Sequence, residues 1–460
     1  MKIRSVLVAN RGEIAVRILR AAKALGLRTV QVYSKADADS LAVRLADEAV
    51  EIGPAAAKKS YLNIEAVLAA AKAAKVDAVH PGYGFLSENA DFAEAVVAAG
   101  MQFVGPSAAA IRLLGDKVAA RQVAAKAGVP TVPGSEGRID DLALATAIAV
   151  RIGFPVMIKA AAGGGGRGIR IAQSAADFER HFPQASAEAA AAFGDGGLYI
   201  EKVIEKARHI EVQILGDGET FVHCFERECS LQRRRQKVWE EAPAFLLPGD
   251  VRARLCASAV ALARSVGYSG AGTVEYLYDE ASREFYFIEV NTRIQVEHPV
   301  TEMITGLDLV QEMLRIAGGE RLSIRQDQIA VSGHAIECRI NAEDPYKNFM
   351  PSPGLVETLE TPNGTGVRFD TMLYAGYVVP PFYDSLLGKL IVRGADRVDC
   401  LARLRAALAD LKITGIPTTV PLHQALAADR DVAAGRFHTR FLEDWLETAF
   451  AAAPGKKEVA

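Results

Sequence analysis

Residues with distinctive chemistry are concentrated in the stretch 284–301, which reads EFYFIEVNTRIQVEHPVT. Residues 284–291 alternate aromatic or polar side chains with aliphatic ones, the period of two that is typical of a half-buried strand. One face of this strand is predicted to carry Phe285, Phe287, Glu289 and Asn291, joined by Arg293 if the strand continues. Because burying a neutral polar group without a partner costs about 2–7 kcal/mol, we expect a charged, oxygen-rich ligand against this face.

A partner strand is predicted just upstream, at residues 272–278 (GTVEYLY), with a turn between the two strands. If the loop is residues 281–283, antiparallel pairing places Glu275 directly opposite Glu289. Like charges that face each other across a hairpin destabilise it, unless a cation lies between them. Two carboxylates and the Asn291 amide are hard oxygen ligands, which suit Mg²⁺ or Mn²⁺. The alternative is an ordinary surface hairpin that Arg283 or Arg293 neutralises, and the hairpin alone does not decide between the two.

A glycine run offers a second candidate binding element. Residues 154–171 (FPVMIKAAAGGGGRGIRI) predict a strand ending in Lys159, a loop of four glycines at 163–166 with Arg167, and a second strand. Glycine amides can close over phosphates without side-chain obstruction, although such a run is also typical of a flexible hairpin. The motif is not GxxxxGK[ST], so a P-loop is excluded. The flanking Lys159 and Arg167 favour a cover over phosphates.

The elements that must position these residues come in three predicted units. Strands at 5–9, 29–33, 78–80 and 102–104 alternate with helices, which predicts a parallel, Rossmann-like sheet with helices on both faces. The loop after the first strand lacks GxGxxG, so a dinucleotide site is not expected. The predicted domains are residues 1–115, 116–332 and 333–447, with a tail at 448–460.

Composition limits the class of protein. The 460 residues are half hydrophobic with a formal net charge of −3, which gives no electrostatic case for nucleic acid or membrane as a partner. No apolar run is long enough to span a bilayer, and the start MKIRSVLVANRGE lacks the apolar run of a signal peptide. The five cysteines are an odd number and form no CxxC pair, so a reducing cytoplasm is the expected location.

With these pieces in order, the chain resembles biotin carboxylase, the ATP-grasp subunit of acetyl-CoA carboxylase and related biotin-dependent carboxylases. The similarity covers essentially the whole chain, and its motifs are HPGYGFLSEN, GGGGRG, QRRRQKV, FIEVNTRIQVEHPVTE and ECRINAEDP. The resemblance implies a mixed α/β and α+β fold: a Rossmann-like N-terminal domain, an ATP-grasp domain with a mobile lid at about 131–203, and a C-terminal biotin carboxylase domain.

The implied activity is ATP- and bicarbonate-dependent carboxylation of biotin through carboxyphosphate, the first half-reaction of acetyl-CoA carboxylase. Another acyl-CoA, urea or keto-acid carboxylase is the alternative. The chain contains no A-M-K-M biotinylation motif, so the biotin is expected on a separate carrier protein. A carboxyltransferase partner and a homodimer are further expectations. A catalytically silent nucleotide-binding protein is disfavoured, because Lys237, Arg293, Glu297 and Arg339 are all present.

The resemblance also gives residue roles. The metal ligands are Glu275, Glu289 and Asn291, in agreement with the hairpin argument. The bicarbonate site is Lys237, Arg293, Gln295, Val296 and Glu297, with Arg293 as the catalytic arginine, Glu297 as the general base and Arg339 contacting bicarbonate and biotin. The cofactor-binding residues are Lys117, Lys159, Gly164, Gly165, Gly166, Glu201, Lys202, His209 and Gln232. The sequence departs from the family pattern at Arg235, Trp239 and Phe245 near Lys237, and at Ala24, where the family has a glutamate in a dimer contact.

Overall fold

The structure is a computed structural model that describes residues 3–135, 137–160, 169–193, 195–322 and 324–450. Its N-terminal sheet has the order β3-β2-β1-β4-β5, with every neighbouring pair parallel. The strands are β1 (Ser5–Val8), β2 (Arg28–Ser34), β3 (Glu48–Gly53), β4 (Ala78–His80) and β5 (Gln102–Phe103). The helices are α1 (Gly12–Ala24), α2 (Leu41–Leu45), α3 (Ile64–Ala73), α4 (Ala90–Ala98) and α5 (Ala108–Gly115).

Alternation along β1 explains why helices cover both faces of this sheet. Val6 and Val8 pack in one buried cluster with Ile14 of α1. Leu7, between them, belongs to a second cluster that includes Phe92 of α4. Successive side chains of a strand point to opposite faces, so each face buries its own core. The predicted parallel sheet with helices on both faces is confirmed.

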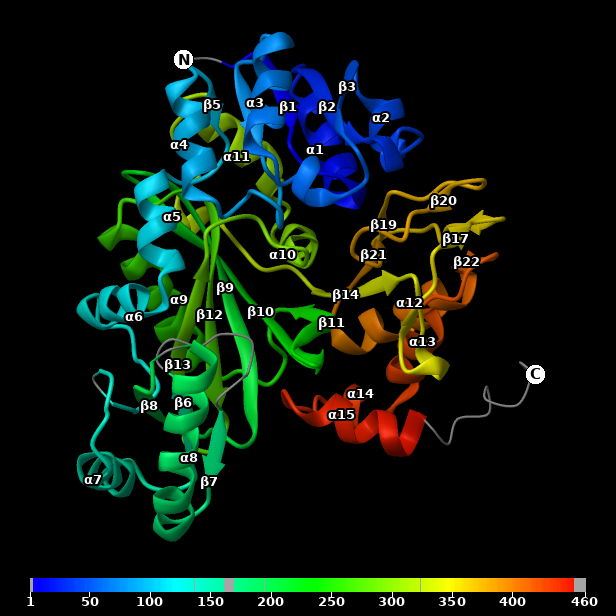
Figure 1. Ribbon diagram of the computed structural model, residues 1–460. Helices are drawn as coiled ribbons and strands as arrows, with labels where there is room; N and C mark the ends of the chain where they lie inside the picture. Colours follow the sequence, from blue (N-terminus) through cyan, green and yellow to red (C-terminus); the bar gives the residue numbers. More distant parts are fainter. Residues whose placement is uncertain (1–2, 136, 161–168, 194, 323, 451–460) are drawn as a thin grey trace.

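The central element is an antiparallel sheet of eight strands in the order β13-β12-β9-β10-β11-β14-β21-β19 (Figure 1). Its strands are β9 (Ala207–Asp217), β10 (Phe221–Arg233), β11 (Gln236–Ala242), β12 (Ser269–Asp279), β13 (Glu284–Asn291), β14 (His334–Asn341), β19 (Val367–Thr371) and β21 (Leu386–Gly394). The accompanying helices are α6 (Lys117–Lys126), α9 (Gly249–Ser265), α10 (His298–Thr305) and α11 (Leu309–Ala317). Since β11 pairs with β14, the sheet continues across residue 333.

One face of this sheet is apolar and the other polar. Ile210, Val212 and Ile214 of β9 pack with α9 in a common core. The intervening residues His209 and Glu211 are buried among polar partners on the opposite face. His209, Glu211 and Gln213 therefore share the polar face, as the period of two along a strand requires.

The hairpin of β12 and β13 has the predicted register at its key position, with Glu275 paired to Glu289. The prediction that one face of β13 carries both the two phenylalanines and the two polar residues Glu289 and Asn291 is wrong. Asp279 pairs with Glu284, and a bulge then adds Ile288 to β13, so that Tyr276 pairs with Phe287. A bulge places an extra residue on one strand and reverses the alternation beyond it. Phe285 and Phe287 therefore pack in the apolar core with Val290, whereas Glu289 and Asn291 lie on the cleft side.

A small three-stranded sheet stands apart at the lower left of Figure 1. It consists of β6 (Val156–Ala160), β7 (Arg170–Ala172) and β8 (Leu198–Lys202), covered by α7 (Leu142–Ile152) and α8 (Ala175–Phe193). Its apolar side chains, among them Ile158, Phe178 and Ile200, form a core of their own. The predicted glycine residues Gly164, Gly165 and Gly166 lie outside the described part of the chain.

The C-terminal part covers the far end of the central sheet with α12 (Arg397–Asp410), α13 (Val420–Ala428), α14 (Arg430–Ala433) and α15 (Phe441–Trp445). Three short strand pairs complete it: β15 (Glu343–Asp344) with β16 (Met350–Pro351), β17 (Gly354–Leu355) with β20 (Val378–Val379), and β18 (Leu359–Glu360) with β22 (Lys412–Ile413). A π-helical turn at Leu446–Phe450 buries Phe450 against Trp445. Within the described residues, no helix combines the length and apolar character needed to cross a lipid bilayer.

Candidate active site

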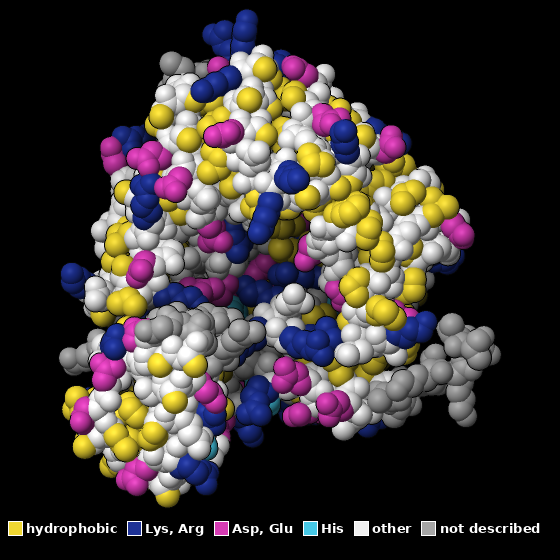
Figure 2. Space-filling view, viewed as in Figure 1, with side chains coloured by type: hydrophobic (Ala, Val, Ile, Leu, Met, Phe, Trp, Pro, Cys, Tyr) yellow, Lys and Arg dark blue, Asp and Glu magenta, His cyan; other side chains and the backbone are white. Residues whose placement is uncertain are grey.

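A cavity of about 960 Å³ opens between the N-terminal unit, the polar face of the central sheet and the C-terminal part. Figure 2 shows this hollow near the centre of the molecule, with Lys and Arg side chains beside Asp and Glu side chains inside it. The structure brings the following predicted site residues to its lining: His209, Gln232, Lys237, Glu275, Glu289, Asn291, Arg293, Gln295, Val296, Glu297 and Arg339. Residues separated by more than a hundred positions in the sequence thus meet in one cleft.

Lys237 lies at the centre of the charged groups. Its ammonium Nζ donates to Glu211 Oε2 at 2.5 Å, Glu275 Oε1 at 2.8 Å and Glu297 Oε1 at 2.6 Å. Burial alone would lower the pKa of Lys237, but the three carboxylates outweigh it and hold that pKa well above its ordinary value. Lys237 reaches them because a bulge at Val238 interrupts the pairing of β10 and β11. The ammonium is a fixed positive charge at the cleft floor.

Glu297, the predicted general base, is held between two cations. Its second oxygen accepts from Arg339 Nη2 at 2.9 Å, opposite the bond from Lys237. Burial alone would raise the pKa of Glu297, but Lys237 and then Arg339 reverse this and lower it. The carboxylate is therefore ionised at neutral pH and is chemically able to accept a proton. Arg339 is also bound through Nε to Glu240 Oε1 at 2.5 Å.

Arg293 follows β13 and points toward the N-terminal unit. Its Nε donates to Glu88 Oε2 at 2.9 Å and its Nη2 to Asn291 Oδ1 at 3.0 Å. Glu88 belongs to the loop HPGYGFLSEN, so this ion pair ties that loop to the cleft. Arg283, the other arginine considered as a neutraliser of the hairpin, lies at its far turn and pairs with Asp250 at 2.6 Å.

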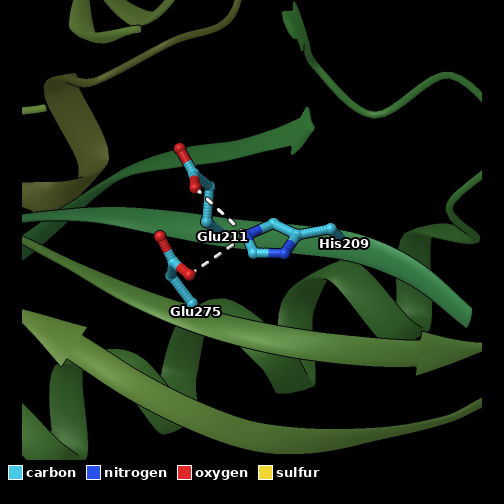
Figure 3. A group of neighbouring side chains, drawn as sticks. All are labelled: His209, Glu211 and Glu275. Atoms are coloured by element: carbon cyan, nitrogen blue, oxygen red, sulfur yellow. Dashed lines mark ion pairs between the residues drawn. The ribbon is translucent and has the colours of Figure 1, made fainter. Parts of the chain in front are cut away.

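His209, Glu211 and Glu275 point toward one another from β9 and β12 (Figure 3). His209 Nε2 lies 3.2 Å from Glu275 Oε2 and 3.5 Å from Glu211 Oε2. Burial alone would lower the pKa of His209, but Glu275 and Glu211 raise it to about 9. Lys237 and His209 correspondingly hold the pKa of Glu275 well below its ordinary value despite burial, which acts in the opposite direction.

The predicted metal ligands fit a divalent cation by their donor chemistry. Glu275 and Glu289 face each other across the hairpin, and Asn291 donates to Glu275 Oε1 at 2.8 Å. Glu289 has no hydrogen-bond or ion-pair partner among the residues that the structure describes. Burial, with the facing Glu275, raises the pKa of Glu289. A divalent cation at this hairpin would relieve that repulsion with oxygen ligands.

Two residues that sequence reasoning left without a role support this floor. Arg227 is fully buried and donates to Glu211 Oε1, Gln213 Oε1 and Gln295 Oε1 at 2.6, 2.7 and 3.0 Å. Lys389 donates to the Val296 carbonyl at 2.8 Å. Arg227 lies in the stretch 226–243 (ERECSLQRRRQKVWEEAP), which is rich in charged residues, but nothing in that stretch indicates that Arg227 is buried. The sequence contains no comparable signal for Lys389.

The predicted nucleotide residues outside the cleft lining occupy the small sheet and α6. Lys159 of β6 and Arg121 of α6 both form ion pairs with Glu201 of β8. Lys202, the next residue of β8, points the other way and donates to the carbonyls of Gly153 and Phe154. Lys117 is exposed at the start of α6. Gln232 lies in the cleft, where Nε2 donates to the Cys229 carbonyl.

Of the three departures from the family pattern near Lys237, only Arg235 reaches the cleft. Trp239 faces the opposite way because of the bulge at Val238, and it is buried in the C-terminal core with its indole donating to Glu241. Phe245 packs against the Arg397 guanidinium, 4.8 Å from the ring centre. Trp239 is therefore a residue of the C-terminal core, whereas Phe245 remains 46% exposed outside the cleft lining.

Comparison with known proteins agrees with this geometry. Residues 116–325 match the family model described as carbamoyl-phosphate synthase L chain, ATP binding domain. This defines the class of protein, an ATP-dependent ligase of the ATP-grasp type. Residues 2–111 match the biotin carboxylase N-terminal domain, and residues 337–444 match the biotin carboxylase C-terminal domain.

Relatives with assigned names extend over almost the whole chain. Biotin carboxylase of Pseudomonas aeruginosa is 54% identical, covering 96% of this chain and 98% of its own. Among solved structures, the biotin carboxylase domain of a thermophilic 2-oxoglutarate carboxylase bound to bicarbonate gives a TM-score of 0.92 at 45% identity, covering 97% and 98%. The domain dimer from Hydrogenobacter thermophilus, in complex with MgADP, ADP and bicarbonate, gives 0.87 at 47%, also covering 97% and 98%. The chain belongs to the biotin carboxylase family, which confirms the resemblance, the fold class and the enzyme class predicted from sequence.

Proposed function

We propose that this chain uses ATP to carboxylate biotin with bicarbonate, on a biotin carrier protein that is a separate molecule. The observation that carries the proposal is the convergence of Lys237 and Arg339 on the two oxygens of Glu297. This arrangement supplies two cations for a small anion and an ionised base beside it.

In the first step, Lys237, Arg293, Gln295 and Val296 bind bicarbonate next to Glu297. Glu297 accepts the bicarbonate proton, and the resulting oxygen attacks the γ-phosphorus of ATP while ADP leaves. The product is carboxyphosphate. Lys237 is suited to this role because its positive charge is fixed by the surrounding carboxylates.

Glu275, Glu289 and Asn291 would hold Mg²⁺ or Mn²⁺, which neutralises charge on the phosphates of ATP when bound. Lys117 and Lys159 would bind those phosphates, with Glu201, Lys202, His209 and Gln232 around the nucleotide. Support for this placement comes from Lys159 and Arg121, which meet on Glu201 at the junction of the small sheet and α6. Gly164, Gly165 and Gly166 are proposed on sequence grounds as the phosphate cover.

In the second step, carboxyphosphate gives CO₂ and phosphate, and the phosphate takes the proton of the biotin ureido nitrogen. Arg293 stabilises the enolate that forms on biotin, and Arg339 contacts biotin. Arg293 is suited to this because it reaches into the cleft from the end of β13, where an ion pair with Glu88 fixes the position of its guanidinium. The nitrogen then attacks CO₂ and forms carboxybiotin.

The experiment is ATP cleavage by the purified chain with Mg²⁺, measured with and without bicarbonate and free biotin. We expect slow cleavage by the enzyme alone and acceleration when both substrates are added. Folded protein whose ATP cleavage shows no dependence on bicarbonate would refute the carboxylase proposal.

The final acceptor of the carboxyl group depends on the partner. Membership of the family supports a biotin carrier partner, and we propose a carboxyltransferase of acetyl-CoA carboxylase as the next enzyme. A keto-acid carboxylase is the second candidate, favoured by the similarity to the 2-oxoglutarate carboxylase domain. Capture of the biotinylated partner from cells and identification of its associated transferase distinguishes the two.

We further propose a homodimer in a reducing cytoplasm. The H. thermophilus relative was solved as a domain dimer, and the five cysteines of this chain are buried free thiols. Ala24 is exposed at the end of α1, where the family contact would lie. Light scattering that finds only the mass of one chain at micromolar concentration would contradict the dimer.

A further inference from the structure

Two buried carboxyl groups beneath Arg339 have no part in the steps above. Glu240 of β11 and Glu337 of β14 are directly paired across the two antiparallel strands. Both are completely buried. Side chains that are directly opposite in such a pair have Cβ atoms about 4.5–5.5 Å apart. The two side chains therefore lie on the same side of the sheet, and the charge of Glu240 acts on Glu337.

The hydrogen bonding of the pair is incomplete for two ionised groups. Glu240 Oε1 accepts from Arg339 Nε at 2.5 Å. Glu240 Oε2 and both oxygens of Glu337 have no hydrogen-bond partner among the described residues. A buried carboxylate without donors is strongly disfavoured, and two that face each other cannot both ionise at neutral pH.

The surrounding charges do not relieve this. Lys389, the cation that most lowers the pKa of Glu337, is already held by the Val296 carbonyl and by Glu13 at 3.1 Å. The titratable and charged groups that act most strongly on the pair from the neighbouring elements are Arg339, Lys389, Lys237, Glu297, Tyr83 and Cys229. Cys338 is adjacent in β14 but lies on the opposite face, in the C-terminal core.

We propose that Glu240 and Glu337 share one proton, and that this pair positions the Arg339 guanidinium for the biotin-dependent step. The proton resides mainly on Glu337, because Glu240 keeps the negative charge that Arg339 neutralises. Burial raises both pKa values, that of Glu240 to about 7 and that of Glu337 well above its ordinary value.

The shared proton sets how firmly Arg339 is held. With one proton in the pair, Arg339 faces a single negative charge there and divides its donors between Glu240 and Glu297. Loss of that proton at alkaline pH doubles the negative charge below Arg339 and draws the guanidinium away from Glu297 and the ligand. This role rests on the proposed function, since it concerns the contact of Arg339 with bicarbonate and biotin.

The direct test is infrared spectroscopy of the full-length protein at about pH 8, where only one proton of the pair remains. The difference between the spectra of wild type and E337Q should contain the C=O stretching band of one protonated buried carboxyl group. The difference between wild type and E240Q should lack it, because Glu337 alone stays protonated. Spectra of wild type and E337Q that are the same in this region would overturn the shared proton whether or not the protein carboxylates biotin.

The functional test is the pH profile of kcat/KM for free biotin, with ATP cleavage measured in parallel. In E337Q the alkaline decline in kcat/KM should shift upward by about one pH unit or more, while ATP cleavage at neutral pH stays close to wild type. E241Q is the matched control: Glu241 is the next buried carboxylate of β11, but it binds Arg397 and His334. An unchanged alkaline decline in E337Q, or the same shift in E241Q, would refute the positioning role.

Discussion

The three cleft cations to which catalytic roles are assigned in the proposal are each already paired with an acid of the protein. Lys237 contacts three carboxylates, Arg339 two, and Arg293 contacts Glu88 of the N-terminal unit. An isolated buried charge would be expensive, so this pairing lets the chain fold with these cations in place. At the proposed site, substrate anions would compete with these internal carboxylates, so binding should be sensitive to the loss of any single cation.

Single substitutions should affect the two proposed half-reactions, ATP cleavage and biotin carboxylation, to different extents. Removing one preorganised donor to a developing oxyanion costs about 2.7–4 kcal/mol, or about 10²–10³ in rate. Arg293→Ala should therefore reduce carboxybiotin formation by about 10²–10³ and reduce ATP cleavage less, with ATP binding retained. Glu297→Gln should reduce both activities together, because bicarbonate is no longer deprotonated. Parallel assays of ATP cleavage and carboxybiotin formation measure the split.

Arg283→Ala is the matched control for these variants. Arg283 belongs to the same hairpin but is exposed at its far turn, paired with Asp250, so both activities should remain at the wild-type level. Carboxylation by Arg293→Ala at a rate near wild type would show that the enolate role belongs to another group.

At the scale of elements, the sequence pattern predicted the strands of the hairpin and the pairing of Glu275 with Glu289. It could not predict the bulge at Ile288, because an aliphatic residue there continues the apparent alternation. The bulge at Val238, which turns Lys237 toward the cleft and Trp239 away from it, was hidden for the same reason. A bulge depends on how a strand pairs with its neighbour, and the period-two pattern of one strand carries no information about that pairing.

The small sheet of β6, β7 and β8 is proposed as the core of a lid spanning about residues 131–203. The buried cluster of the small sheet contains no residue of the eight-stranded sheet. The described backbone links to the eight-stranded sheet come from the segment at the start of the proposed lid: Phe287 N donates to the Pro130 carbonyl, and Thr131 forms a bridge with Phe287. A unit with its own core and few ties can move as a body, and closure would protect a labile acyl phosphate from water.

We predict that nucleotide brings this unit closer to the C-terminal part. Fluorophores attached to exposed positions of α8, such as Glu179, and of α12, such as Val398, would report the distance by energy transfer. MgATP should raise the transfer efficiency, whereas bicarbonate alone should not. Equal efficiency with and without MgATP would argue against a closing lid.

At the scale of the whole molecule, the cleft exists only because three units meet. Arg17 of α1 binds Glu302 of α10 at 2.8 Å and Asp308 at 2.7 Å, and Glu13 of α1 pairs with Lys389 of β21. These contacts join residues hundreds of positions apart. Motifs allowed the site to be predicted, but charge partners such as Glu88, Glu240 and Lys389 depend on how the units pack, which local pattern does not encode.

The buried ion pairs also make the whole molecule sensitive to acid. Burial would raise the pKa of Glu211, Glu241, Glu275 and Glu297, but neighbouring cations outweigh it and lower each pKa below the ordinary value of 4.5. Below pH 4.5 the unfolded chain therefore takes up protons before the folded one does. The stability that these carboxylates contribute is complete above about pH 4.5 and is lost as pH falls through their folded pKa values.

Glu241 isolates this effect, because it lies outside the cleft and its carboxylate is held by Arg397 and His334. Glu241→Gln should lower the free energy of unfolding at neutral pH, since it removes one half of a buried pair. It should also flatten the acid slope by up to about 1.4 kcal/mol per pH unit, the contribution of one proton. Urea unfolding between roughly pH 3 and 7 measures both effects. Glu360→Gln, at an exposed pair with Lys412, serves as the control and should change neither. An acid slope in Glu241→Gln as steep as in wild type would mean that this carboxylate is not stabilised by its buried partners.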